Sequence, residues 1–239
     1  MKISTRLAVL AFVVGVLTLP SQAATIVVAP GEVLLLNNGI CSLREAILNA
    51  EGGTTVSADC TAGSAGADVI ELAAGSTYVL PDRDPYPLEV LLNDQETTGL
   101  PELHTTFTIN GNGATIQRDP AAATCFRIFY VSRLGNVSLN NMTLANGCVN
   151  VVDPGPAGNE HGAGGAILNR GTLSLDLITM RNNSASRSGG AIHNDGTLTM
   201  MRSTVRNNGM SIGAGGGIVN RGVMQVLQST ISANTTPGA

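Results

Sequence analysis

The feature that most constrains this chain is a repeat of 25 to 26 residues in its carboxyl half. Three segments that begin Gly-Gly-Ala-Ile or Gly-Gly-Gly-Ile start at residues 164, 189 and 215. A second motif keeps the same spacing, in the segments 179–183, 204–208 and 230–234, and a degenerate earlier copy covers 135–146. Repeats of this kind indicate a stack of equivalent units, because each unit can bury its apolar face only against its neighbours.

Within each repeat, apolar residues alternate with polar ones. Leu173 and Leu175 flank Ser174, and the same alternation returns at 198–200 and 224–226. A period of two is typical of β-strands, and glycine and asparagine end these strands after a few residues. Helical repeats need longer runs with a period of 3.6 residues, and the Leu-x-x-Leu-x-Leu frame of leucine-rich repeats is absent. The sequence therefore predicts an all-β chain in which each repeat is one coil of a parallel β-helix, with about three short strands per coil.

Equivalent residues of successive coils should lie above one another, about 4.8 Å apart. We expect two interior columns, formed by Ile167, Ile192 and Ile218 and by Met180, Val205 and Ile231. Side-chain amides at the turns should hydrogen-bond along the stack in two asparagine ladders. The first ladder is Asn169, Asn194 and Asn220, and the second is Asn183, Asn208 and Asn234.

The region 24–103 predicts a cap and an entry to the coils, which occupy 104–239. Ser42 and Glu45 form a capping box, and the apolar residues that follow predict a helix over 43–50, ended by Gly52 and Gly53. This helix would cover the unpaired strand edges at one end of the stack. Strands are expected at 69–72, 77–80, 107–110 and 114–117, with a Gly/Asn turn between the last two. Residues 81–102 and 151–162 are expected to be a surface loop and an insertion.

Residues 1–23 predict a secretory signal peptide. Lys2 and Arg6 precede an apolar run over 7–19 that is too short to span a bilayer, and small residues precede a cleavage site after Ala23. The mature chain would carry eleven arginines, no lysine and 17 acidic residues, a net charge of −6. Its acidity and its 3% of aromatic residues argue against nucleic-acid binding. No later segment is apolar for long enough to predict a transmembrane helix.

Four cysteines in an exported chain predict two disulfides. The spacings of 19 and 23 residues favour the pairs Cys41–Cys60 and Cys125–Cys148. Closing loops of this size stabilises the folded chain by roughly 3 kcal/mol each. A zinc site is the weaker alternative, because the sequence has no Cys-x-x-Cys and no histidine at ligand spacing from a cysteine.

Residues 41–46, Cys-Ser-Leu-Arg-Glu-Ala, resemble the CSLREA signature of exported bacterial proteins. In that family the signature commonly precedes right-handed parallel β-helix repeats. The glycine repeats are similar to those of polymorphic outer-membrane proteins and other pectin-lyase-like folds, although the usual Phe-x-x-Asn is Met-, Val- or Ile-x-x-Asn here. The resemblance implies a right-handed solenoid that is secreted or displayed on a bacterial surface. It implies no catalytic residues, since the signature marks no known chemistry.

Acidic residues are scarce in the coils. From residue 164 onward they are Asp176 and Asp195, which do not stack on other acids, so the two carboxylates of a glycoside hydrolase are missing there. Asp82 and Asp84, in the densest acidic segment, are expected to lie in a solvated loop. No calcium-loop pattern accompanies them.

The sequence has three histidines. His104 precedes a strand, and His161 lies in the glycine-rich insertion. His193 occupies a repeat position that Leu168 and Val219 fill in the neighbouring coils, which favours a structural residue over a catalytic one.

The sequence thus predicts no catalytic residue, no metal site and no cofactor. The leading hypothesis is a secreted or surface-displayed protein of the outer membrane, acting as a scaffold, adhesin or passenger domain that binds carbohydrate or a host or cell-surface protein. The alternative is a polysaccharide-active lyase or hydrolase with a divergent site. Because residue 239 follows directly on a repeat, we expect a fragment, a truncated reading frame or end-to-end self-association.

Overall fold

The computed structural model of the chain describes residues 22–53, 56–84, 98–150, 162–213 and 215–236. Most of the predicted signal peptide, nearly all of the 151–162 insertion and His161 lie outside the described residues. Strands dominate the rest, and one helix accompanies them in the part of the chain described.

The elements of the amino half are β1 (Thr25–Val27), α1 (Leu43–Gly52), β2 (Asp68–Glu71), β3 (Thr77–Leu80), β4 (Thr106–Arg118), β5 (Phe129–Val131), β6 (Asn136–Ala145) and β7 (Cys148–Val149). Those of the carboxyl half are β8 (Ile167–Asn169), β9 (Thr172–Arg181), β10 (Ser184–Ala185), β11 (Ile192–Asn194), β12 (Thr197–Met201), β13 (Thr204–Arg206), β14 (Gly209–Met210), β15 (Ile218–Asn220), β16 (Val223–Leu227) and β17 (Thr230–Ser232).

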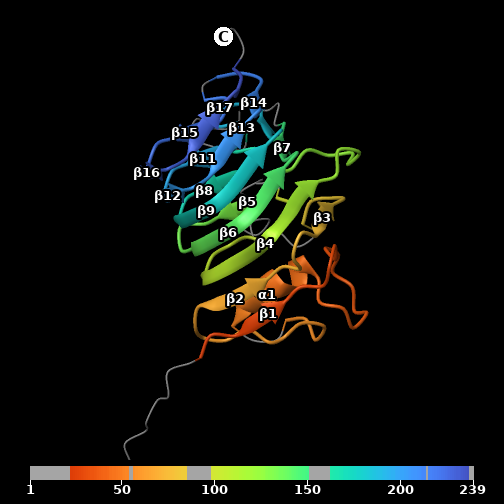
Figure 1. Ribbon diagram of the computed structural model, residues 1–239. Helices are drawn as coiled ribbons and strands as arrows, with labels where there is room; N and C mark the ends of the chain where they lie inside the picture. The colour runs from red at the N-terminus through yellow and green to blue at the C-terminus, as the bar shows by residue number, and fades with distance from the viewer. Residues whose placement is uncertain (1–21, 54–55, 85–97, 151–161, 214, 237–239) are drawn as a thin grey trace, which may run out of the picture.

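These strands form three parallel sheets, and each strand pairs with its counterpart in the next repeat. The large sheet has ten strands, with the order β1-β2-β4-β6-β9-β12-β16 and with β3, β13 and β17 alongside. The other two sheets are β5-β8-β11-β15 and β7-β10-β14. Figure 1 shows the strands of successive repeats running side by side in one direction. The prediction of an all-β chain with parallel pairing is confirmed.

The core consists of columns of apolar side chains that run along the stack. The longest crosses seven strands of the large sheet: Ile26, Ile70, Ile109, Leu139, Leu175, Met200 and Val226. The first six are fully buried, whereas Val226 in the last coil is 37% exposed. Both predicted columns exist in register. The isoleucine column begins at Phe129, and the second one extends back to Leu144, Ile116 and Tyr78.

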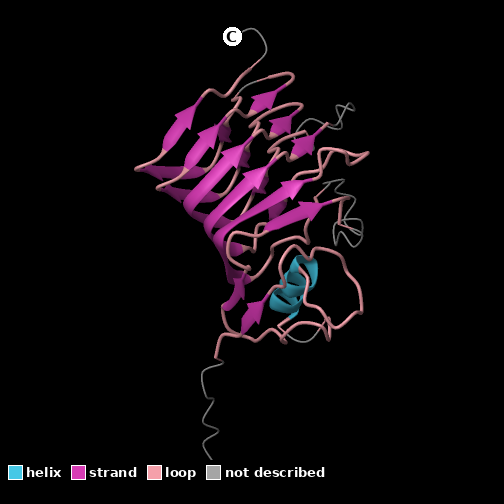
Figure 2. Cartoon of the chain, turned by 45° about the vertical axis from the view of Figure 1, so that its right-hand side comes forward, coloured by secondary structure: helices cyan, strands magenta, loops and turns pink. Residues whose placement is uncertain are grey.

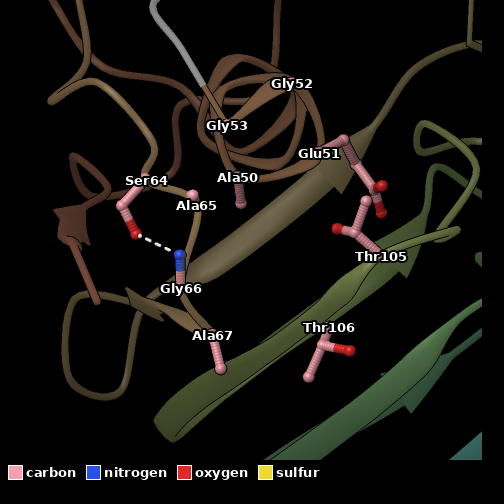
Figure 3. Close-up of a pocket in the computed structure, with 10 residues that line it drawn as sticks. All are labelled: Ala50, Glu51, Gly52, Gly53, Ser64, Ala65, Gly66, Ala67, Thr105 and Thr106. Carbon is pink, nitrogen blue, oxygen red and sulfur yellow. Dashed lines mark hydrogen bonds between the residues drawn. The ribbon is translucent and has the colours of Figure 1, made fainter. Parts of the chain in front are cut away.

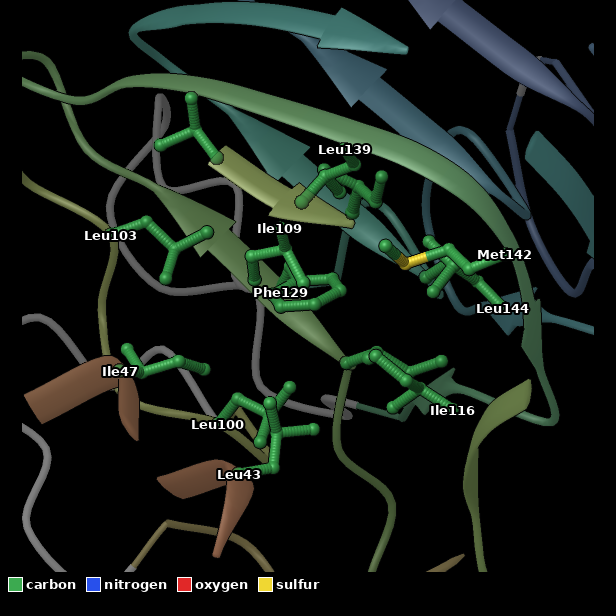
Figure 4. Packing of buried hydrophobic residues seen from close by; sticks show 14 of the residues in the cluster. Leu43, Ile47, Leu100, Leu103, Ile109, Ile116, Phe129, Leu139, Met142 and Leu144 are labelled. Atoms are coloured by element: carbon green, nitrogen blue, oxygen red, sulfur yellow. The ribbon is translucent and has the colours of Figure 1, made fainter. Parts of the chain in front are cut away.

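The helix begins and ends as the capping residues require. The Glu45 amide donates to Ser42 Oγ, the Ser42 amide donates to Glu45 Oε2, and Gly53 takes the left-handed conformation that ends the helix. The helix reaches residue 52, two residues beyond the predicted end. It lies at the β1–β2 end of the molecule (Figure 2). In Figure 4 its Leu43 and Ile47 lie beside Leu100 and Leu103, and all four belong to the continuous core cluster.

One predicted turn is part of a strand instead. The segments 107–110 and 114–117 belong to a single strand, β4, rather than to two strands joined by a Gly/Asn turn. Both halves of β4 pair with β6, and the register shifts between Asn110 and Ala114, so Asn141 stands opposite three residues. The two extra residues are absorbed as a bulge because the neighbouring strand holds both flanks in the ladder.

At the same bend of the large sheet, the neighbouring strands hold residues in the left-handed region without glycine. Asn141, Leu177, Arg202 and Gln228 occupy equivalent positions and have φ values between 47° and 56°. Asparagine tolerates this conformation, but a leucine side chain is strained there by about 1–2 kcal/mol. Leu177 is also 47% exposed, so little burial offsets the strain.

Replacing Leu177 by asparagine should therefore stabilise the protein. We expect Leu177→Asn to raise the free energy of unfolding by about 0.5–1 kcal/mol, because strain is relieved with little loss of packing. The reverse change at the equivalent position, Asn141→Leu, should lower it by a similar amount. Urea unfolding followed by circular dichroism measures both, and a destabilised Leu177→Asn would contradict the strain argument.

Candidate functional site

The CSLREA-like segment is built into the junction between helix and core. Leu43 and Ala46 are fully buried, and Cys41 pairs with Cys60 across the loops that flank the helix. Arg44 is 2% exposed: its Nη2 donates to the backbone oxygen of Asp82 at 2.7 Å and to Oδ1 at 2.8 Å, and its Nε donates to the Gly99 oxygen at 3.1 Å. Each of these residues contributes to packing or to the contacts that hold the helix.

Asp82 and Asp84 differ in their exposure to solvent, and residues 85–97 of the expected loop lie outside the described residues. The Asp82 side chain is 62% exposed and ion-paired to Arg44. Asp84 is 2% exposed and its amide donates to the Thr98 oxygen, so the expectation of a solvated loop is wrong at this residue. The hydrogen bond to Thr98 accompanies the burial of Asp84. The repeat pattern gave no sign of that contact, because the loop lies outside the repeats.

Both disulfides join cysteines that are consecutive in the sequence. Cys41–Cys60 has a Cα separation of 4.6 Å, and Cys125–Cys148 has one of 5.0 Å. The second connects the segment after β4 to β7, and no free cysteine is present in the described residues.

The six ladder asparagines stack along the two turns. Asn169 Nδ2 donates to Asn194 Oδ1, and Asn194 Nδ2 donates to Asn220 Oδ1, both at 2.6 Å. In the other ladder, Asn183 donates to Asn208 at 3.0 Å, and Asn208 donates to Asn234 at 2.9 Å. The four buried asparagines of the ladders also each donate to a backbone oxygen, such as that of Val223 for Asn194. The ladders thus satisfy backbone groups that the turns would otherwise bury without partners.

Removing the side chain of a buried ladder asparagine should lower the free energy of unfolding far more than removing that of an exposed one. Asn194 is fully buried, whereas Asn220 is exposed. We expect Asn194→Ala to lower the free energy of unfolding by about 3 kcal/mol, because it leaves several buried polar groups unpaired. Asn220→Ala should cost less than about 1 kcal/mol, since water replaces its partners. Equal effects in denaturant titrations would contradict this account of the ladders.

A hollow of about 510 Å³ lies at the end of α1. It is lined by residues 50–53, 64–67 and 105–106 (Figure 3). Ser64 is already engaged, since its Oγ accepts from the Gly66 amide and donates to Asp68. Glu51 accepts from the His104 amide at 2.9 Å, and its Oε2 lies 3.0 Å from His104 Nδ1, at an angle bent away from an ideal hydrogen bond. Glu51 is the one carboxylate among the described residues that line the hollow, and Asp68 lies behind Ser64.

The side-chain contact with Glu51 raises the pKa of His104, and partial burial opposes the rise. Because the folded-state pKa lies above the unfolded value of about 6.5, the pair stabilises the fold fully below that value. The contribution disappears as the pH rises through the folded-state pKa. His104 is thus tied to the end of the helix.

The melting temperature should report this pair. We expect His104→Gln to lower it at about pH 5.5 and to have a much smaller effect at about pH 9, where the wild-type ring is neutral. Differential scanning calorimetry at the two pH values, with wild type and variant side by side, measures the difference. A deficit in the variant that grows with pH would contradict the assignment.

The middle coil contains a cluster of three polar side chains that the sequence did not predict. Ser188 Oγ lies 2.8 Å from His193 Nδ1, and His193 Nε2 lies 3.1 Å from Asp195 Oδ1. The ring is fully buried, Ser188 is 9% exposed, and the Asp195 side chain is 26% exposed. The sequence assigned His193 a structural role from its repeat position alone. The signal that could have revealed the cluster is the joint presence of serine and aspartate five residues before and two residues after the histidine.

Asp176, which with Asp195 makes up the acidic residues after position 164, is paired with Arg202 of the next repeat. Among the described residues, no three histidine, cysteine, aspartate or glutamate side chains lie close enough together to hold a metal ion. The helix of the described region is not long and apolar enough to cross a membrane.

Comparison of the chain with protein-family models, with curated proteins and with solved structures found no match.

Proposed function

We propose that the chain is a right-handed parallel β-helix that is exported and acts as a scaffold, adhesin or passenger domain on or outside a bacterial cell. The uninterrupted core column across seven strands and the two disulfides support a rigid rod suited to an oxidising exterior. The CSLREA-like segment supports the same view, because its residues are engaged in the cap of the stack.

The observation that carries the proposal is a row of six threonines across the large sheet. Paired positions place Thr77, Thr115, Thr143, Thr179, Thr204 and Thr230 in one line. They alternate with buried core residues and therefore face away from the core, with spacings of about 4.8 Å. A parallel row contains Thr108, Ser138, Ser174 and Thr199.

This face is chemically suited to a polysaccharide. Each threonine offers a hydroxyl that donates and accepts, together with a methyl group, so the face combines polar and apolar contacts at regular intervals. A chain ligand with repeating hydroxyl groups can make the same contact at several rungs, and its affinity then grows with the number of engaged rungs. A carbohydrate is therefore the ligand class that we propose for the scaffold.

Four carboxylates of the described residues are already engaged by other side chains. Asp82 pairs with Arg44, Asp176 pairs with Arg202, and Glu51 contacts His104. Glu71 accepts from the side chains of Asn110 and Asn112. These engagements favour the scaffold over the lyase or hydrolase.

Binding to insoluble polysaccharides tests the proposal. The full mature chain should co-sediment with at least one of cellulose, chitin and a cross-linked pectate. The combined variant Thr143→Val, Thr179→Val and Thr204→Val should weaken that binding by about tenfold or more, because it removes three hydroxyls and keeps the side-chain shape.

The control is Thr61→Val with Thr124→Val, two exposed threonines outside the row. Equal binding by control and row variant, or no binding to any of the three materials, would overturn the carbohydrate proposal. Release of reducing ends or unsaturated sugars would favour the enzyme alternative instead.

A further inference from the structure

We propose that Ser188, His193 and Asp195 form a nucleophilic relay, in which Ser188 Oγ takes up acyl groups from small activated esters. The three side chains form one continuous chain of contacts, 2.8 Å from Ser188 Oγ to His193 Nδ1 and 3.1 Å from His193 Nε2 to Asp195 Oδ1. Enzymes that activate a hydroxyl often use this arrangement: the hydroxyl contacts a base, and a third group orients the base. This inference goes beyond the scaffold role, and either can fail without the other.

For a neutral ring, the two contacts select one tautomer of His193. An ionised Asp195 can only accept, so Nε2 of a neutral His193 carries the ring proton and donates it. Nδ1 of the same ring is then an acceptor, and the Ser188 hydroxyl donates to it. This is the protonation state that a general base needs before it removes a proton from a hydroxyl. The roles of the two ring nitrogens are exchanged relative to the chymotrypsin arrangement, but each has the same partner type.

The neighbouring coils show that the fold does not require these residues. The three positions hold Ala163, Leu168 and Arg170 in the preceding coil, and the repeat spacing assigns them to Ala214, Val219 and Arg221 in the following one. The middle coil thus differs from both neighbours at all three positions. Serine and histidine replace residues that have no acid–base chemistry, and aspartate replaces arginine. Because β8, β11 and β15 pair in register, packing alone does not account for the set.

The backbone around the relay is closely packed. Gly189, directly after Ser188, has a φ of +62°, and an added Cβ there would come within 2.1 Å of the Ile192 oxygen and 3.0 Å of the His193 nitrogen. The chain therefore folds closely back over the histidine, whose ring is fully buried. The backbone oxygen of Ser188 accepts a hydrogen bond from the Gly164 amide at 3.0 Å, which fixes the serine to the preceding coil. Ser188 itself is 9% exposed, so we expect it to react with small acyl groups rather than bulky ones.

The step conserves atoms and charge. Ser188 Oγ attacks the carbonyl carbon of the ester while its proton passes to His193 Nδ1, so a C–O bond to the serine forms. The bond to the leaving alkoxide or phenoxide breaks, and the leaving group or solvent takes the proton from His193. Asp195 is a positioning residue that stabilises the ring while it carries the extra proton. Water then hydrolyses the acyl-serine and releases the acid.

Covalent labelling of the full mature chain tests the relay. With p-nitrophenyl acetate and with a small alkyl fluorophosphonate, we expect adducts at Ser188, located by peptide mass spectrometry. His193→Leu, which introduces the residue type of Leu168 in the preceding coil, should slow labelling by about 100-fold, because the general base is lost. Asp195→Asn should also slow it, and Asp195→Glu should restore part of the rate. Thermal melting checks that each variant is folded.

The matched control is Ser132, which is also 9% exposed but belongs to another coil. Ser132→Ala should leave the labelling rate unchanged, whereas Ser188→Ala should abolish the adduct. No adduct at Ser188 with either reagent, or the same rate in His193→Leu as in the wild type, would overturn the proposal. Should His193→Leu fail to fold, His193→Gln must show the same loss of labelling, and an unchanged rate there would also overturn it.

Discussion

The whole structure depends on in-register parallel pairing between successive repeats. Because each residue lies beside its equivalent in the next coil, one apolar residue per repeat becomes a continuous column, and one asparagine becomes a ladder. The large sheet extends this principle beyond the recognisable repeats, from Ile26 to Val226. A shift by one residue would turn every core side chain outward, so the register and the core specify each other.

The parts of the fold that follow from periodicity could be predicted from the sequence. Met180, Val205 and Ile231 lie in register as the 25- to 26-residue spacing indicates, and the capping box at Ser42 starts the helix. Prediction failed where a contact depends on a neighbour without a repeat signal. Residues 107–117 contain a turn-like Gly/Asn segment, yet β6 holds both flanks in one strand. Arg44 and Asp84 are buried by contacts with distant loops, which no local pattern encodes.

The relay shows why a repeat can hide a site. Compared one position at a time, His193 is simply the polar member of a column that also holds Leu168 and Val219. Its meaning appears only when Ser188 and Asp195 are read with it, and their contacts with the ring depend on the backbone that folds back at Gly189. The asparagine ladders could be foreseen because they repeat, whereas the relay is present in one coil.

The energetics of burial also argue that the three residues belong together. A neutral imidazole in the Leu168 position would leave two ring nitrogens without partners, and each unpaired buried group costs about 1–3 kcal/mol. Ser188 and Asp195 remove that penalty by contacting one nitrogen each. Even so, a satisfied polar chain stabilises a core less than the leucine or valine of the adjacent coils. The stability of such a stack is approximately a sum over neighbouring coils. One less stable coil in its interior is therefore tolerated, since the coils on either side keep their own apolar residues. The departure from the repeat is then best explained by chemistry that leucine and valine cannot perform.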